Sequence, residues 1–143
     1  MVLGESKNMD KYKIAIIGLG YVGIPLARLL ATKYPVVGYD INFERVKDLK
    51  SGFDSTLELD EKTLNSVLVD SIPETNGLFC SNNINDIKNC NYFIITVPTP
   101  VDANRNPVLK PLINASKTVG SVIKKGDVVI YESTVYPGTT EEV

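Results

Sequence analysis

The segment KIAIIGLGYVG, from Lys13 to Gly23, constrains the fold of this chain more than any other stretch. Its first half, Ile14–Ile17, is a short apolar run that stops at a glycine, which is typical of a strand buried on both faces of a parallel sheet. Gly18, Gly20 and Gly23 follow in the spacing G-x-G-x-x-G, ahead of a helical pattern. In this spacing the first glycine permits a tight turn, the second lets the backbone approach a pyrophosphate, and the third lets the helix pack close to the strand. The N–H groups and dipole of the helix N-terminus would then face the phosphates.

The glycine spacing alone is weak evidence, because a strand–turn–helix unit without a ligand shows the same pattern. Here a second apolar run, Val36–Tyr39, ends at Asp40, which lies 20 residues beyond Gly20. A carboxylate at that place can accept hydrogen bonds from an adenosine ribose, so the context predicts a dinucleotide site. Asp40 favours the free 2′-hydroxyl of NAD and repels the 2′-phosphate of NADP. Arg45 lies one turn into the next helix, where it is either a neighbour of Asp40 or a solvated surface charge.

Strand and helix patterns alternate along the rest of the chain. This alternation predicts an α/β fold, a doubly wound parallel sheet of the Rossmann type with strand order 3-2-1-4-5 and right-handed crossovers. We expect one NAD-binding domain over residues 11–143, preceded by a flexible tail over residues 1–10. After the first strand we expect a helix over Val22–Lys33, with Val22, Leu26, Leu29 and Leu30 facing the sheet. The expected strands that follow are Val36–Tyr39, Leu78–Ser81, Tyr92–Val97 and Asp127–Tyr131. Between them we expect a helix from the N-cap Asn42 to Lys50, a connecting loop at Asp54–Glu58, a helix over Asp60–Leu68, a turn or short helix over Asn83–Asn89 and a helix over Leu112–Lys124.

Two further loops follow strands and therefore reach the edge of the sheet where ligands bind. Thr99 stands between Pro98 and Pro100, which end one strand and stiffen the loop after it. It either faces the cofactor or is an exposed threonine in a rigid turn. The last strand runs into the segment Glu132–Thr140, where Thr139 or Thr140 is expected to cap another helix.

Composition excludes several classes of function. The chain has 143 residues, 43% hydrophobic and 22% charged, with a net charge of −2. The charge gives no reason to expect nucleic acid or an anionic membrane as a partner, and no apolar run approaches membrane-spanning length. The first dozen residues lack the apolar core of a signal peptide, so we expect a cytoplasmic protein. With no histidine and only Cys80 and Cys90, the chain lacks histidine acid–base chemistry and an ordinary zinc site. We expect both thiols to be reduced and buried as small apolar side chains.

With these motifs the chain resembles the N-terminal NAD-binding domain of the UDP-glucose/GDP-mannose dehydrogenase family, the nucleotide-sugar 6-dehydrogenases. The matching pieces are IGLGYVGIPLA, the acid at Asp40, VPTP at Val97–Pro100 and ESTVYPGTT at Glu132–Thr140, in this order. The DSTLE segment at Asp54–Glu58, with VPTPVD and YESTVYPG, looks most like the branch that oxidises UDP-N-acetylhexosamines for bacterial capsules and surface polysaccharides.

The resemblance implies a function. Members of this family oxidise the C6 alcohol of a nucleotide sugar to a carboxylate in two steps with two NAD⁺, through cysteine-bound intermediates. By the same resemblance, the backbone at Tyr21 and Val22 would hold the pyrophosphate, Asp40 and Arg45 the adenosine ribose, and Thr99 the dinucleotide. Thr134 would lie near the nicotinamide and help to position a water, with Ser133 and Glu132 beside it.

The family's nucleophilic cysteine, UDP-sugar pocket and homodimer interface belong to later domains, and neither Cys80 nor Cys90 stands in a matching motif. We therefore expect this chain to be a fragment that binds NAD weakly and catalyses nothing alone. Two alternatives remain open. One is a non-catalytic NAD-sensing regulatory domain like those of potassium-transport systems. The other is an NAD-dependent dehydrogenase of the hydroxyacid or 6-phosphogluconate type. The VPTP and ESTVYPG loops favour the nucleotide-sugar family over both.

Overall fold

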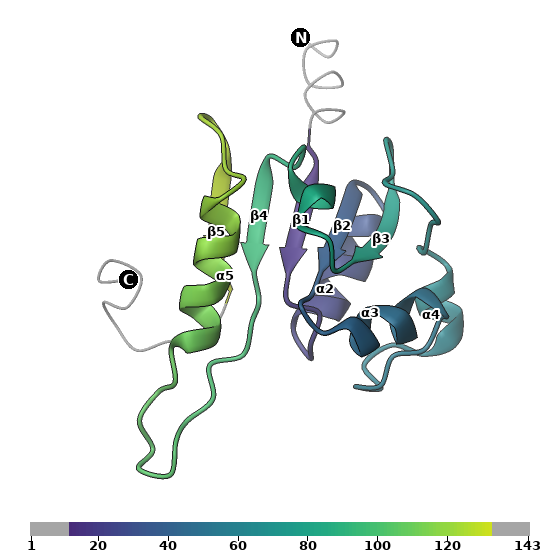
Figure 1. The fold of residues 1–143 in the computed structure, drawn as a ribbon. Helices are drawn as coiled ribbons and strands as arrows, with labels where there is room; N and C mark the ends of the chain where they lie inside the picture. The colour runs from purple at the N-terminus through teal and green to yellow at the C-terminus, as the bar shows by residue number, and fades with distance from the viewer. Residues whose placement is uncertain (1–11, 133–143) are drawn as a thin grey trace, which may run out of the picture.

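The computed structural model describes residues 12–132. Its centre is one five-stranded parallel sheet with the strand order β3-β2-β1-β4-β5 (Figure 1). The predicted doubly wound sheet and its strand order are therefore confirmed. The predicted tail over residues 1–10, together with Ser133, Thr134 and the expected cap at Thr139 or Thr140, lies outside the described residues. The strands are β1 (Ile14–Ile17), β2 (Pro35–Tyr39), β3 (Gly77–Ser81), β4 (Tyr92–Ile95) and β5 (Val128–Tyr131).

The three central strands end level with one another. Ile17 at the end of β1 pairs with Tyr39 of β2 on one side and with Ile95 of β4 on the other. Every residue of β1 and β2 is buried, as their continuous apolar runs predict for a sheet covered on both faces. The segments that leave β1, β2 and β4 consequently begin side by side at one edge of the sheet.

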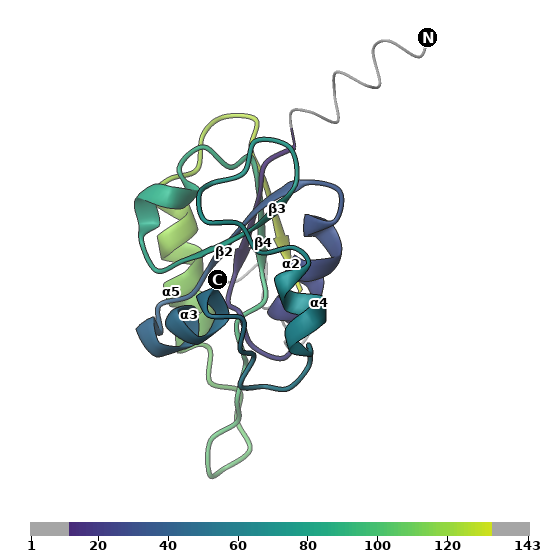
Figure 2. The ribbon, with the colours of Figure 1, turned by 90° about the vertical axis from the view of Figure 1, so that its right-hand side faces the viewer.

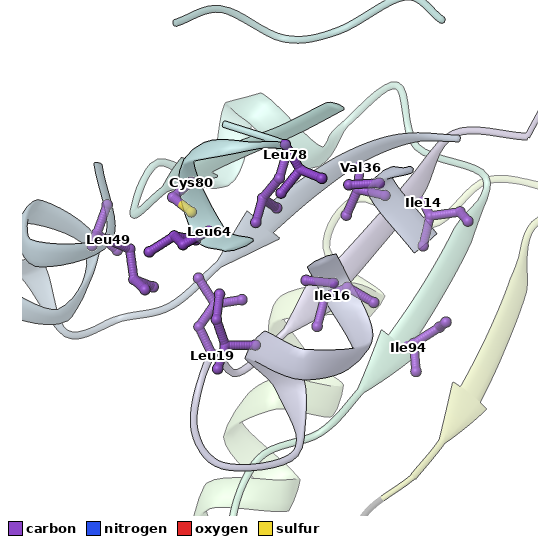
Figure 3. Close-up of a cluster of buried hydrophobic side chains, with 14 residues drawn as sticks. Ile14, Ile16, Leu19, Val36, Leu49, Leu64, Leu78, Cys80 and Ile94 are labelled. Atoms are coloured by element: carbon purple, nitrogen blue, oxygen red, sulfur yellow. The ribbon is translucent and has the colours of Figure 1, made fainter. Parts of the chain in front are cut away.

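Helices cover both faces of the sheet (Figure 2). On one face, α2 (Gly23–Ala31) and α4 (Glu61–Asn65) pack over a cluster that includes Ile16, Val36 and Leu78. The helix α3 (Phe43–Lys50) adds Val46 and Leu49 to this cluster, whose side chains are drawn in Figure 3. On the other face, α5 (Lys110–Gly120) and the short 3-10 helix η1 (Ile84–Ile87) enclose a second cluster. Its largest fully buried side chain is Phe93.

The predicted buried face of α2 is only partly right. The helix buries Gly23, Ile24, Ala27 and Ala31 against the sheet. Leu26 and Leu30 are half-buried at the border of the cluster, whereas Val22 and Leu29 are exposed. The small residues form the contact face because the glycine turn brings the helix axis close to the strands, where leucines would not fit. The buried face of α2 is therefore displaced by about one residue from the face that the apolar spacing predicts.

Several element ends also differ from the sequence-based expectation. The helix α5 begins at Lys110, two residues earlier than expected, because Pro111 fits the first turn, and it ends at Gly120 rather than Lys124. The predicted N-cap Asn42 is confirmed, because its side chain accepts from the Arg45 N–H. Asp60 caps α4 in the same way, by accepting from the Thr63 N–H. No helix within residues 12–132 is long and apolar enough to cross a membrane.

Candidate functional site

The turn after β1 needs glycine at its first position. Gly18 has φ +103°, a backbone conformation that side chains other than glycine rarely adopt. Its N–H donates to the Tyr39 carbonyl across 2.8 Å, which ties the turn to the end of β2. A Cβ on Gly18 would also stand 3.0 Å from Val97 at the end of the neighbouring strand. The predicted role of this glycine in the tight turn is therefore supported by its geometry.

The third glycine lets α2 lie against this turn. A Cβ on Gly23 would stand 1.8 Å from the Gly18 carbonyl oxygen and 2.7 Å from Oγ1 of Thr96. Thr96 is buried, and its hydroxyl donates to the Gly18 carbonyl at 2.7 Å and to the Ile17 carbonyl at 3.2 Å. Sequence reasoning missed Thr96, although its place just beyond a strand at the ligand-binding edge could have drawn attention to it.

Gly20 differs from the other two glycines because it faces open space. A Cβ added there would meet no atom of the described residues within 4 Å, and its φ lies outside the range that only glycine favours. Within residues 12–132 no side chain caps the N-terminus of α2, and the first turn of the helix carries no acidic residue. Tyr21 and Val22 are 69% and 56% exposed beside it. An uncapped helix end beside an open backbone is the kind of place where an anion can bind, and pyrophosphate binding by Gly20, Tyr21 and Val22 stays a prediction.

Asp40 stands at the end of β2 with its carboxylate held in a fixed orientation. Oδ2 accepts a 2.9 Å hydrogen bond from the Leu19 N–H in the glycine turn. Oδ1 accepts one of the same length from the Asn42 N–H. Each oxygen retains a further lone pair, and the side chain is only half-buried. The carboxylate can therefore still accept hydrogen bonds from hydroxyl groups of a ligand.

Arg45 is buried beneath the turn, with 8% of its surface exposed, so the surface-charge alternative is wrong. Its Nε donates to the Leu19 carbonyl at 2.7 Å. Its Nη1 lies 2.8 Å from Oδ1 of Asp54 and donates to the Ser55 hydroxyl at 3.1 Å. Its Nη2 is buried and has no hydrogen-bond partner among residues 12–132. Leu19 thus receives a contact from Arg45 on its carbonyl while its N–H binds Asp40.

Asp54 lies in the segment that the sequence predicts to be a connecting loop. It is buried, and Oδ1 accepts hydrogen bonds from the Thr56 N–H and hydroxyl while Oδ2 accepts from the Leu59 N–H. Burial alone would raise the pKa of Asp54, but the hydrogen bonds from Thr56, Leu59 and Arg45 outweigh it and hold the pKa below its ordinary value. The carboxylate is therefore charged at neutral pH, and it forms a buried ion pair with Arg45.

The segment after β4 leaves the same edge of the sheet on the other side of β1 and runs into the long loop that precedes α5 (Figure 1). Thr99 is half-buried in this segment. Beyond it, Val101 pairs with Pro107, and the Val108 N–H donates to the Pro100 carbonyl at 2.7 Å. Glu132 follows β5, where its N–H donates to the Ile95 carbonyl at 2.9 Å. The structure thus gathers Gly18, Gly20, Gly23, Asp40 and Arg45 around Leu19, and leaves Thr99 on the β4 side of the turn.

The two cysteines and the acidic side chains are candidates for reactive or metal-binding groups. The cysteines are both buried, as predicted, and burial raises the pKa of each thiol to about 12. Neither thiol is therefore a thiolate at neutral pH. No group of three or more Cys, Asp or Glu side chains within residues 12–132 is arranged to hold a metal ion.

Comparison with known proteins identifies relatives of this domain. A model of the UDP-glucose/GDP-mannose dehydrogenase family, NAD binding domain, matches residues 12–143. UDP-N-acetyl-D-glucosamine 6-dehydrogenase of Pseudomonas aeruginosa is 51% identical over 134 residues, which are 94% of this chain and 30% of that protein. Protein CapL of Staphylococcus aureus is 45% identical over 129 residues, 90% of this chain and 28% of that protein. The chain spans about 30% of the length of these curated relatives.

A solved structure with the same fold carries a related name. UDP-D-ManNAc dehydrogenase from Pyrococcus horikoshii superposes with a TM-score of 0.75 at 38% sequence identity. The match covers 91% of this chain and 30% of that one. The fold agreement therefore extends over nearly the whole chain, and the matched part of the relative is again about a third of its length.

Proposed function

The chain belongs to the UDP-glucose/GDP-mannose dehydrogenase family, of which it matches the NAD-binding domain, and from this premise we propose that it is the cofactor-binding part of a nucleotide-sugar 6-dehydrogenase. The longer protein would oxidise the C6 alcohol of a UDP-sugar to a uronate, reducing two NAD⁺ to NADH. The relatives named as UDP-N-acetylhexosamine dehydrogenases favour a UDP-N-acetylhexosamine as the substrate. The resemblance to CapL supports a place in capsule or surface-polysaccharide synthesis.

The observation that carries the proposal is the placement of Asp40 beside the open glycine turn. Its two oxygens are oriented by the Leu19 and Asn42 amides, and each can accept another hydrogen bond. Gly20 leaves the backbone accessible one residue from Leu19. A ribose diol on Asp40 and a pyrophosphate at the N-terminus of α2 are the two anchors that a bound NAD requires.

Each remaining site residue has a proposed role within this function. The backbone at Gly18, Gly20, Tyr21, Val22 and Gly23 would surround the pyrophosphate, and Thr99 would contact the dinucleotide from the β4 side. Ser133 and Thr134 would lie near the nicotinamide, with Thr134 helping to position a water for the reaction. Bound NAD⁺ would supply the hydride acceptor, and the residues of this chain would hold it in place.

Calorimetric titration of the 143-residue chain with NAD⁺ and NADP⁺ tests the cofactor assignment. We expect binding of NAD⁺ in preference to NADP⁺, and a loss of affinity of about tenfold or more in Asp40→Ala, because the ribose loses its charged acceptor. Preference for NADP⁺, or undiminished NAD⁺ binding by Asp40→Ala, would contradict the assignment.

The substrate is tested on a protein that contains the remaining domains. Reduction of two NAD⁺ per UDP-N-acetylhexosamine supports the proposed dehydrogenase. NAD⁺ binding without turnover of any UDP-sugar would favour the NAD-sensing alternative instead. We also propose that this longer protein is a cytoplasmic homodimer joined through its later domains, which sedimentation of the full-length protein and of this chain would test.

A further inference from the structure

The cofactor site contains two residues that favour opposite cofactors. Asp40, at the end of β2, favours the free 2′-hydroxyl of NAD. An arginine near the same place is the feature that accommodates the 2′-phosphate of NADP. Arg45 is such an arginine, since its Nε binds the carbonyl of Leu19 and the amide of Leu19 binds Asp40. The sequence favours NAD through Asp40, but it does not show what balances the charge of Arg45.

The structure shows that the charge of Arg45 is paired with Asp54. Its Nη1 lies 2.8 Å from Oδ1 of Asp54, and the two side chains are 8% and 0% exposed. A buried ion pair of this kind is strongly coupled, because each charge has lost its water and depends on the other. With Asp54 in place, Arg45 and Asp54 together are neutral, and Asp40 is left as the net charge at the ribose.

We propose that Asp54 is a specificity-determining residue that keeps this domain selective for NAD by neutralising Arg45. This inference rests on the proposed NAD-binding function and adds a second acidic determinant to Asp40. Asp54 does not need to touch the cofactor, because it acts through the guanidinium beside the ribose site.

The loop around Asp54 is built to hold the carboxylate at Arg45. Thr56 donates to Oδ1 through both its N–H, at 3.0 Å, and its hydroxyl, at 2.6 Å, and the Leu59 N–H donates to Oδ2 at 2.9 Å. Ser55 adds a second contact to Nη1 of Arg45. These bonds fix the acid in the position where it cancels the arginine, so a carboxylate elsewhere on the loop would not replace it.

Arg45 lies beneath the turn with 8% of its surface exposed, so it acts on a phosphate at the ribose through its charge. Its Nη2 is buried and has no hydrogen-bond partner among the described residues. When Asp54 becomes neutral, Nη1 loses its ionic partner as well, and the guanidinium carries an unbalanced positive charge. A 2′-phosphate at the ribose would then meet an attractive cation in addition to the repulsive Asp40.

The test compares the dissociation constants of NAD⁺ and NADP⁺ in four forms of the 143-residue chain. These are the wild type, Asp54→Asn, Asp60→Asn and the double variant Arg45→Met/Asp54→Asn. Asp60→Asn is the matched control, since it removes one negative charge from the same loop while an asparagine still caps α4. The double variant removes both partners of the ion pair and leaves no buried charge unpaired.

We expect Asp54→Asn to lower the ratio of the NADP⁺ to the NAD⁺ dissociation constant on the order of tenfold, as one unbalanced charge near a phosphate should. The ratio should stay at its wild-type value in Asp60→Asn and return toward that value in the double variant. If Asp54 had a purely structural role, Asp54→Asn would weaken the binding of both cofactors equally and leave the ratio unchanged, which would overturn the inference. A ratio that stays lowered in the double variant, which lacks Arg45, would also overturn it.

The outcomes separate this inference from the proposed function. A wild type that binds neither cofactor would contradict NAD binding itself, whereas a wild type that binds NAD⁺ with a ratio insensitive to Asp54 would refute only the role of Asp54. Circular dichroism checks that each variant is folded. If Asp54→Asn does not fold, Asp54→Ser provides the same loss of charge with a smaller side chain that can still hydrogen bond.

Discussion

Replacing Gly23 by alanine should destabilise the fold, because the new methyl group has no room. Its carbon would stand 1.8 Å from the Gly18 carbonyl oxygen and 2.7 Å from Oγ1 of Thr96. The first of these atoms belongs to the backbone, and Thr96 holds it in place by a hydrogen bond at 2.7 Å. Neither neighbour is the end of a flexible side chain, so α2 or the turn itself must shift.

The size of the effect follows from two opposing contributions. Overfilling a packed site costs about 1–3 kcal/mol and sometimes more, and a clash with backbone belongs at the upper end of that range. Alanine gains about 1 kcal/mol over glycine within a helix. We therefore expect Gly23→Ala to lower the free energy of unfolding by about 2 kcal/mol, which corresponds to a decrease in Tm of roughly 5–8 °C for a domain of this size.

Gly20→Ala is the matched control, and it should separate stability from binding. Its methyl group would meet no atom of residues 12–132 within 4 Å, so the free energy of unfolding should change by less than about 0.5 kcal/mol. Its methyl group would, however, occupy the space through which a pyrophosphate approaches the backbone. We expect NAD⁺ affinity to fall by about tenfold or more in this variant, roughly the loss of one good contact.

Urea unfolding followed by circular dichroism measures the first effect, and calorimetric titration with NAD⁺ measures the second. The two alanine variants should give opposite results: Gly23→Ala loses stability, and Gly20→Ala loses NAD⁺ binding while it remains as stable as the wild type. A stable Gly23→Ala protein, or a Gly20→Ala protein that binds NAD⁺ as the wild type does, would refute the assignment of these two roles.

Three further outcomes follow from the same structure. Thr96→Val should cost about 1–2 kcal/mol of unfolding free energy, because the Gly18 carbonyl loses its hydroxyl donor; urea unfolding measures this, and an unchanged midpoint would contradict it. The pKa of Asp54 is lowered in the folded protein, so its stabilising effect is present above about pH 4 and lost as the pH falls further. Unfolding free energies measured against pH should therefore decline less steeply in acid for Asp54→Asn than for the wild type. Burial raises the pKa of Cys80 and Cys90 to about 12, so a disulfide reagent at neutral pH should modify them only as fast as the protein unfolds, and rapid modification of the native protein would disprove this.

The sheet could be predicted because its signals are local. Ile14–Ile17 and the later apolar runs are short, continuous and bounded by turn residues, so their strand order follows from their connections. The contact face of α2 could not be derived in the same way. Its burial depends on how closely the glycine turn brings the helix to the strands, and at that distance Ala27 and Ala31 are buried while Leu29 is 59% exposed. Tertiary geometry thus overrode the hydrophobic pattern.

The candidate site was predictable where a motif fixes the backbone, and unpredictable where residues distant in sequence meet. The glycines and Asp40 stand at the spacing that the chemistry requires. Thr96 is 78 residues from the Gly18 carbonyl that it binds, and no local pattern links the two. Asp54 and Arg45 are close in sequence, but their contact joins a loop to a helix and has no local pattern, so the sequence showed only an arginine of open role and a connecting loop.

These contacts together explain how a turn made of conformationally free glycines is held in one conformation. Thr96 binds the turn from just beyond β4, Asp40 binds it from just beyond β2, and Arg45 binds it from α3. Each of these bonds reaches a backbone atom of Gly18 or Leu19, and Gly20, one residue further, is left open to a ligand. A ligand that binds there meets amides whose orientation is already set, so little ordering of the backbone opposes binding. Affinity for the dinucleotide should therefore depend on Thr96 and on the Arg45–Asp54 pair as well as on the glycines, even though Thr96 and Asp54 need not contact it.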